Sequence, residues 1–191
     1  MSISEIGKVV ESTAIPIDTP GGEGLSGLEK LNGKDTTNTL SAEGVGKEYD
    51  PASDAAKIDT INSGLEDTKH PVSDVPFTRD TVELPDGKLV EGVFPEFDPI
   101  TETQLEPNGG GDYKGTRAEH ETEANKDLKD QIANNSDLRD KFSQEQLEQI
   151  ENGDTPDGHT WHPHQEPGKM QLVDQKTHNA TAHTGGYILW G

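Results

Sequence analysis

The chain has 191 residues, of which only 28% are hydrophobic, so any packed core is small or local. Its 37 acidic and 16 basic residues give a net charge of −21, which argues against general affinity for phosphate backbones because that affinity rests on Lys and Arg. Cysteine is absent, which excludes disulfides and thiolate ligands and leaves His, Asp, Glu or Asn to hold any metal.

Residues 1–68 have a linker-like composition. They contain one aromatic residue, Tyr49, among many Gly, Thr, Ser, Asp and Glu residues, and we expect at most short helical or strand pieces there. The N-terminal MSISEIGKVV lacks the basic region and apolar block of a signal peptide, and no apolar run approaches the roughly 20 residues that span a bilayer. We therefore expect no membrane insertion by this chain and, if the protein is secreted, export that depends on another segment or machine.

From Lys69 onward the sequence predicts a folded region. The run VELPDGKLV has apolar residues on either side of Pro85-Asp86-Gly87, which predicts a β-hairpin with a turn that contains glycine. Phenylalanines at 77, 94 and 97 supply the apolar bulk that residues 1–68 lack.

Two helices are predicted after the glycine-rich break PNGGGDYKG. Residues 121–134 place Ala124, Leu128 and Ile132 at spacings of four, which indicates an amphipathic helix. The second helix has Ser143 at the N-cap position with Gln146 as its capping-box partner, and Asn152-Gly153 as a stop signal.

The C-terminal residues contain five of the seven histidines of the chain. Residues 159–164 (HTWHPH) and 170–174 (MQLVD) read as two strands, and residues 175–182 read as a short helix. A ββα unit this small buries little, so it is often built around a metal whose ligand bonds supply folding energy.

Three of these histidines are candidate metal ligands. His162 lies on the first strand, His178 on the helix, and His183 just past the helix end, because its separation of five from His178 does not fit one helix face. Three imidazoles that converge on one divalent ion leave a coordination position open, as a catalytic metal needs.

An ordered set of residues in this region also matches a known pattern: Trp161-His162, Gly168-Lys169-Met170-Gln171-Leu172-Val173, His178, His183-Thr184-Gly185-Gly186 and Trp190-Gly191. With this set, the sequence resembles the WHH family of nuclease toxins, a branch of the HNH/endonuclease VII superfamily that uses the ββα-metal fold. The resemblance covers about residues 70–191 and is far more specific than a pair of histidines.

The resemblance implies an α+β fold in which a small ββα-metal (HNH-like) module, residues 155–191, follows two helices and a β-hairpin in a toxin domain spanning residues 69–191. It implies a metal-dependent endonuclease that hydrolyses phosphodiester bonds, in DNA rather than RNA. His162, His178 and His183 would hold a divalent ion, with Zn, Mg, Mn and Ni as candidates.

The resemblance further implies a role in competition between bacteria. The chain would be the effector piece of a secreted toxin, delivered into the cytoplasm of a target bacterium and neutralised by a cognate immunity protein.

One position departs from the family pattern. Pro163 stands where relatives have the second His of a Trp-His-His triplet, whose role is to act as the general base toward the attacking water. The following His164 takes over that role only if Pro163 introduces a bulge, since residues 162 and 164 share one face of a regular strand. Three interpretations are open: His164 is the base, the chain is an inactive form, or the histidine register is shifted or His159 participates.

Other residues near the motif have structural interpretations. We expect His159 to be a strand residue that faces solvent, and Trp161 and Trp190 to pack in the small core. Asp174 is either a partner that fixes the tautomer of a metal ligand or the N-cap of the last helix.

The rival to a nuclease is a non-catalytic binding module that a metal stabilises and whose acidic surface docks a partner. From Thr155 onward the chain has three acidic and two basic residues, so the net charge lies almost entirely outside the predicted metal site. A bound divalent ion would make that site locally positive, so phosphate could still be engaged there.

Overall fold

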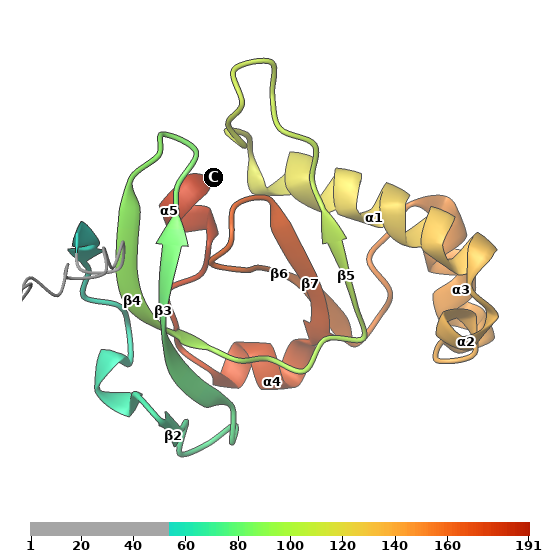
Figure 1. The fold of residues 1–191 in the computed structure, drawn as a ribbon. Helices are drawn as coiled ribbons and strands as arrows, with labels where there is room; N and C mark the ends of the chain where they lie inside the picture. The colour runs from blue at the N-terminus through green and yellow to red at the C-terminus, as the bar shows by residue number, and fades with distance from the viewer. Residues whose placement is uncertain (1–53) are drawn as a thin grey trace, which may run out of the picture. The chain divides into compact units, whose positions relative to one another are not determined.

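Two small β-sheets and five α-helices make up residues 54–191, the part of the chain that the computed structural model describes (Figure 1). The four-stranded sheet has the order β1-β4-β3-β2, and the three-stranded sheet has the order β5-β7-β6. The α+β class expected from the sequence is confirmed. The expectation of linker-like residues at 1–68 falls mostly outside the described residues.

The strands of the four-stranded sheet are β1 (Ala56–Lys57), β2 (Thr68–Lys69), β3 (Pro76–Glu83) and β4 (Leu89–Pro95). Those of the three-stranded sheet are β5 (Thr101–Gln104), β6 (His159–Pro163) and β7 (Lys169–Asp174). The helices are the 3-10 helix η2 (Ser63–Leu65) and the α-helices α1 (Arg117–Asn134), α2 (Ser136–Arg139), α3 (Gln144–Asn152), α4 (Gln175–Ala180) and α5 (Tyr187–Trp190). Among the described residues, no helix is long and apolar enough to cross a membrane.

The predicted β-hairpin is present as the antiparallel pair β3 and β4. Val82 lies opposite Val90 in the register, and the turn between the strands places Gly87 at a φ of 80°. A positive φ is readily adopted by glycine, which explains why this turn contains one. Phe77 and Phe94 are fully buried on this hairpin, so they supply the apolar bulk expected of them.

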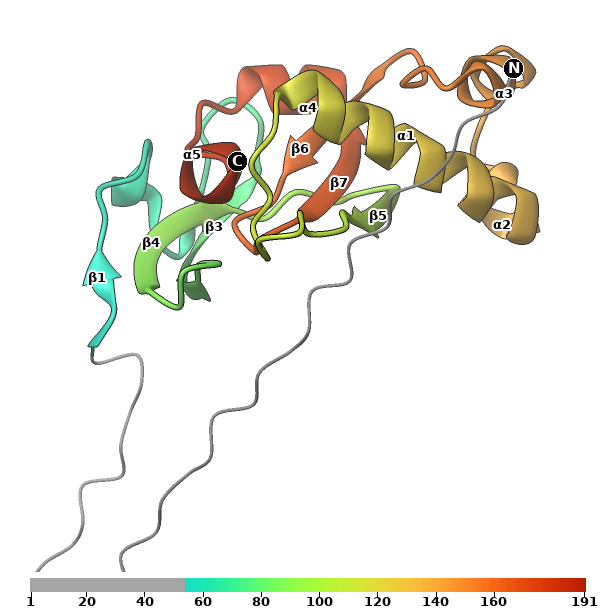
Figure 2. The ribbon, with the colours of Figure 1, turned by 90° about the horizontal axis from the view of Figure 1, so that it is seen from above.

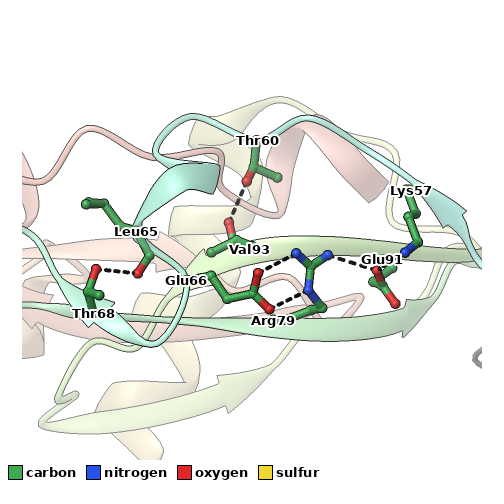
Figure 3. Close-up of polar contacts among 8 residues, drawn as sticks. All are labelled: Lys57, Thr60, Leu65, Glu66, Thr68, Arg79, Glu91 and Val93. Carbon is green, nitrogen blue, oxygen red and sulfur yellow. Dashed lines mark hydrogen bonds and ion pairs between the residues drawn. The ribbon is translucent and has the colours of Figure 1, made fainter.

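Residues before Lys69 also belong to this sheet. Strand β1 pairs in parallel with β4, and the Thr60 hydroxyl donates to the carbonyl of Val93 at 2.6 Å. Figure 3 shows Arg79 on β3 between two carboxylates: both oxygens of Glu66 accept from its guanidinium at 2.5 Å, and Glu91 accepts at 2.8 Å. These bonds raise the pKa of Arg79 and lower that of Glu66. Residues 56–69 are therefore joined to the hairpin by backbone pairing and by a two-carboxylate clamp.

Helix α1 begins at Arg117, four residues before the predicted start. Thr116 and Glu119 form a capping box: the Thr116 side chain accepts from the Glu119 backbone N–H at 3.2 Å, and Glu119 accepts from the Thr116 N–H at 2.7 Å. This pair satisfies two free N–H groups and fixes the earlier start. The predicted apolar face of the helix is confirmed, because Ala124, Leu128 and Ile132 are all buried.

Helix α3 has the predicted boundaries. Ser143 and Gln146 form its capping box, and Gly153 ends it in the left-handed conformation with a φ of 87°. Seen from above, α1 extends along the three-stranded sheet, and α2 and α3 lie at its far end (Figure 2).

Asn125 links these helices to the sheet. Its Oδ1 accepts from the Trp161 indole N–H at 2.7 Å and from the Thr155 hydroxyl at 3.1 Å, while its Nδ2 donates to the Gly153 carbonyl at 3.0 Å. The side chain is buried, so all three bonds lie in a region where an unmade bond is costly. The core around this network contains Leu105, Ala124, Leu128, Ile132, Leu138, Phe142, Ile150, Trp161, Met170, Leu172 and Trp190.

We expect Asn125→Ala to lower the free energy of unfolding by about 2–4 kcal/mol, because each buried partner left unsatisfied costs about 1–3 kcal/mol. Asn134→Ala is the matched control: it lies on the same helix, is exposed, and donates to the Asp130 carbonyl. That control should cost about 0.5 kcal/mol or less. Urea denaturation followed by tryptophan fluorescence measures both, and equal losses would show that the Asn125 network adds nothing to stability.

Candidate functional site

The two faces of strand β6 carry different chemistry. Trp161 points into the core and is 1% exposed, whereas His162 points to the opposite face of the sheet, as the strand alternation predicted. Strands β6 and β7 pair in antiparallel fashion from His159, opposite Asp174, to Pro163, opposite Met170. Helix α4 follows β7 directly, so the predicted ββα unit is present.

The three histidines predicted as ligands come together on this unit. One ligand nitrogen from each of His162, His178 and His183 lies within 4.8 Å of those of the other two. Their ring centroids are 5.5 Å apart for His162 and His178, and 4.9 Å apart for the other two pairs. Within residues 54–191 this is the single group of three or more His, Cys, Asp or Glu side chains with such geometry. We call it the histidine trio.

Local capping places the two C-terminal members of the trio. Asp174 accepts from the Thr177 backbone N–H and hydroxyl, both at 2.7 Å, so it is the N-cap of the helix that carries His178. The helix ends at Ala180, two residues before the predicted end, and His183 lies beyond it as expected. The Nδ1 of His183 donates to the Thr181 carbonyl at 2.6 Å, which leaves its Nε2 without a proton in the neutral ring.

Phe97 covers the trio, although no sequence pattern predicts a place for it at the site. Its ring centroid lies 4.7 Å from that of His162, 5.4 Å from His178 and 5.3 Å from His183. Phe97 follows β4 and packs with Val75 and Val173. An apolar ring against all three imidazoles removes water from them, and this desolvation favours their neutral form.

The electrostatics of the trio suit metal ligation. Burial lowers the pKa of His162 to about 2, with further contributions from the charges of His183 and His178. Burial also lowers the pKa of His178 to about 4, and it lowers the pKa of His183. Arg117, the first residue of α1, lowers the pKa of all three further by its charge. Neutral imidazoles are the form that binds metals, so no proton need be displaced at neutral pH.

Ring nitrogens without hydrogen-bond partners also indicate a metal-binding site. Both ring nitrogens of His162 and the Nε2 of His178 are buried without a hydrogen-bond partner. Such groups cost free energy unless something satisfies them, and a divalent cation would do so. The donor set therefore fits a metal ion held by three imidazoles.

Residues from the N-terminal side hold the loop that bears His183. The Ile61 backbone N–H donates to the Thr184 hydroxyl at 3.0 Å, and the Asn62 side chain donates to the Ala182 carbonyl. The Thr181 hydroxyl donates to that of Ser73 at 2.6 Å. Residues 61–73 thus hold the loop at 181–184 through contacts that no local sequence pattern predicts.

His164 is not a member of the trio. The pairing of β6 with β7 is regular as far as Pro163, and the His164 N–H continues it by donating to the Lys169 carbonyl at 2.9 Å. The bulge that would re-aim His164 is therefore not found within β6. Its Nδ1 accepts from the Glu166 backbone N–H at 3.2 Å, and burial lowers its pKa. The ring lines a cleft of about 470 Å³ beside the trio, together with Asp80, Glu96, Glu102 and Lys169.

His159 is also outside the trio, and its expected exposure to solvent is wrong. It is half-buried, with its ring centroid 5.9 Å from that of Phe142, and its Nδ1 is buried. The reason is the strand alternation, which puts residue 159 on the same face as Trp161, toward the helices.

The C-terminal residues are hydrogen-bonded to the end of β6. The Trp190 indole N–H donates to the His164 carbonyl at 2.8 Å, and the Gly186 N–H donates to the Pro163 carbonyl at 2.8 Å. A Cβ on Gly186 would overlap the His164 carbonyl oxygen, so only glycine allows this approach. The Thr-Gly-Gly and Trp-Gly motifs therefore both hold the C-terminal residues against the carbonyls of Pro163 and His164. The expected burial of Trp190 is confirmed.

A trio of one buried and two half-buried histidines on a ββα unit, set in an α+β domain, defines a small domain with a candidate metal-ligand site. The family model for the DNase/tRNase domain of colicin-like bacteriocins matches residues 86–185, just over half of the chain. The chain belongs to this family, which places it among the nuclease toxins of bacteriocin type. All three histidines lie within the matched residues. No curated protein and no solved structure gives a significant match to the chain.

Two adjacent glycines provide a matched pair of substitutions. We expect Gly186→Ala to lower the free energy of unfolding by about 3 kcal/mol, because backbone atoms must move to admit the methyl group. A Cβ on Gly185 would lie 3.5 Å from the Pro163 carbonyl oxygen, an ordinary contact. Gly185→Ala should therefore cost less than about 1 kcal/mol. Chemical denaturation compares the two, and similar losses would contradict the close approach of the C-terminal residues to β6.

Proposed function

We propose that this chain is a metal-dependent endonuclease of the WHH type that hydrolyses phosphodiester bonds in DNA. The observation that carries the proposal is the convergence of three imidazoles, two of which have buried nitrogens without partners, on a ββα unit inside a nuclease-toxin domain. We further propose that the toxin acts in the cytoplasm of a competing bacterium after delivery and that a cognate immunity protein neutralises it.

His162, His178 and His183 would hold the divalent ion. Such an ion supplies Lewis-acid stabilisation of the charge that develops on the phosphate and on the leaving oxygen. The hydrogen bond from His183 to the Thr181 carbonyl fixes its tautomer, and Phe97 keeps water from the rings. Three protein ligands leave coordination positions for substrate, as a catalytic site requires.

Arg117 is a candidate for binding the substrate phosphate. Its charge lowers the pKa of all three imidazoles, and its side chain, which pairs with Glu121 at 3.3 Å, is 56% exposed. A guanidinium matches a phosphate through two parallel N–H donors. We propose that it helps to hold the scissile phosphate beside the trio.

The general base is the weak part of the site. Pro163 has no side-chain nitrogen, and His164 accepts a hydrogen bond at Nδ1, which puts the proton of its neutral ring on Nε2. His164 could take a proton only after giving up its bond to the Glu166 N–H. This observation favours a second candidate function, a non-catalytic module that a metal stabilises and that docks a partner through its acidic surface.

Metal titration tests the ligand set. We expect the purified chain to bind one zinc ion, and saturating zinc to stabilise it by about 2.7 kcal/mol when free zinc is about 100 times Kd. His178→Ala should lose most of this stabilisation because it removes one of three ligands. Lys176→Ala, an exposed change on the same helix, should keep it. Calorimetric titration and thermal denaturation give both values, and unchanged binding in His178→Ala would rule out the trio as the metal site.

Cleavage assays on supercoiled plasmid and on transfer RNA, with magnesium, manganese, nickel or zinc, test the reaction. A positioned base contributes about 10²–10⁴ to such a rate, but residue 163 lies opposite Met170 on the core face of β6, away from the trio. We therefore expect Pro163→His to leave plasmid nicking at the parent rate, and a gain would show that the end of the strand turns this side chain toward the metal. The double variant Pro163→His/His178→Ala should lose any such gain, because it lacks a metal ligand.

The comparison with His164→Ala separates the alternatives. Activity in the parent that falls in His164→Ala, with no gain in Pro163→His, would identify His164 as the base. If every variant binds metal and none cleaves either substrate, the binding module replaces the nuclease as the function. Faster cleavage of transfer RNA than of plasmid would contradict the preference for DNA.

A further inference from the structure

The face of the three-stranded sheet that carries His162 contains a row of three polar residues, one from each strand. His162 on β6 is directly opposite Gln171 on β7, and Gln171 is directly opposite Glu102 on β5. Directly opposed residues of antiparallel strands project to the same face with Cβ atoms about 4.5–5.5 Å apart. The three side chains are therefore neighbours across the sheet.

Glu102 fixes how the Gln171 amide lies. The Gln171 Nε2 donates to a carboxylate oxygen of Glu102 at 2.6 Å. A carboxylate accepts and does not donate, so the amide turns its N–H toward Glu102 and its carbonyl oxygen away from it. That oxygen, Oε1, is buried and has no hydrogen-bond partner, and Gln171 as a whole is only 6% exposed.

His162 lacks a hydrogen-bond acceptor, whereas Gln171 lacks a donor. Both of its ring nitrogens are buried without a partner, and only one of them can face a metal. The other nitrogen then carries the ring proton and needs an acceptor. Phe97, whose ring centroid lies 4.7 Å from that of His162, offers none, and the rings of His178 and His183 would be committed to the metal.

We propose that Gln171 is the positioning residue of His162: its Oε1 accepts the ring N–H of His162 when the other ring nitrogen holds the metal, and Glu102 keeps the amide in that orientation. The row His162–Gln171–Glu102 links the metal site, across all three strands, to the cleft that Gln171 and Glu102 line. This inference rests on the proposed metal site. It assigns Gln171 no contact with the ion or with substrate.

The distinguishing property of such a residue is that it matters more with metal than without. In the chain without metal, Gln171→Leu removes one bond to an exposed carboxylate and an oxygen that has no partner, so stability should change little. With metal, the loss of the acceptor should weaken binding about 10–100-fold, the usual effect of removing the partner of a ligand histidine.

The experiment compares zinc affinity by calorimetric titration with thermal denaturation of the metal-free protein, for the parent, Gln171→Leu and the exchange variant Gln171→Glu/Glu102→Gln. Gln104→Leu is the matched control, because it makes the same change at an exposed position on the same face of the sheet. We expect Gln171→Leu to bind zinc about 10–100-fold more weakly with an unchanged metal-free melting temperature, and Gln104→Leu to bind like the parent. The exchange variant keeps one carboxylate and one amide in the row and should restore the affinity.

Parent-like affinity in Gln171→Leu would overturn the assignment. A large fall in its metal-free melting temperature, with no recovery of affinity in the exchange variant, would also overturn it and leave Gln171 a structural residue. If the parent itself binds no zinc, the proposed metal site fails, which is a different result from a parent that binds and a variant that binds equally well.

Discussion

The gathering of three imidazoles at one buried place, with three of their nitrogens unpartnered, is the constraint on which the rest of the structure depends. Each such nitrogen costs about 1–3 kcal/mol if nothing satisfies it. A chain with so few apolar residues can tolerate this only because other contacts hold the loop and strands in place. A metal at the proposed site would remove the cost, so metal binding and folding stability should be coupled.

Strand β6 must serve the core and the site at once, and two tryptophans hold it. Trp161 points away from the trio and is fixed by its indole bond to Asn125 on α1. Trp190 donates to the carbonyl of His164, just past the strand end. Both indole N–H groups have hydrogen-bond partners in buried surroundings. The strand is therefore held on its core face by Trp161 and at its C-terminal end by Trp190. This explains how a five-residue strand can hold His162 in a defined place.

Local patterns in the sequence were sufficient for part of this architecture. The hairpin turn with Gly87, the capping box of α3 and the order of His162, His178 and His183 all depend on residues close in sequence or on a long ordered motif. Long-range contacts were not predictable in this way. Asn62 bonds a carbonyl 120 residues away, and Asn125 is a polar residue within a mostly polar helix, so neither carries a periodic signal.

Phe97 and Gln171 illustrate the same limit at the site itself. Phe97 lies between β4 and β5. A single aromatic residue in such a segment predicts burial but does not indicate which residues it covers. Gln171 lies within a strand motif, and its amide is oriented by Glu102, which is 69 residues away on another strand. The motif itself does not predict that contact. The alternation of β6 predicted that His162 and Trp161 face opposite ways, but the register between strands decides which side chain meets His162.

The acidity of the chain gives a proposed metal ion a second role. In the cleft beside the trio, burial opposes the charge of Lys169, yet its bond to Glu166 and the charges of Glu102 and Glu96 raise its pKa above the usual value. A phosphate that enters this cleft meets negative potential, and the three imidazoles add no positive charge because burial keeps them neutral. Arg79 and Lys169 also line the cleft, but both are paired with carboxylates, as Arg117 is with Glu121. The charge of a bound dication would therefore decide whether substrate binds at all, as well as how fast it is cleaved. In a nuclease built on so acidic a chain, affinity for nucleic acid would then come from the metal site itself and only weakly from the rest of the surface.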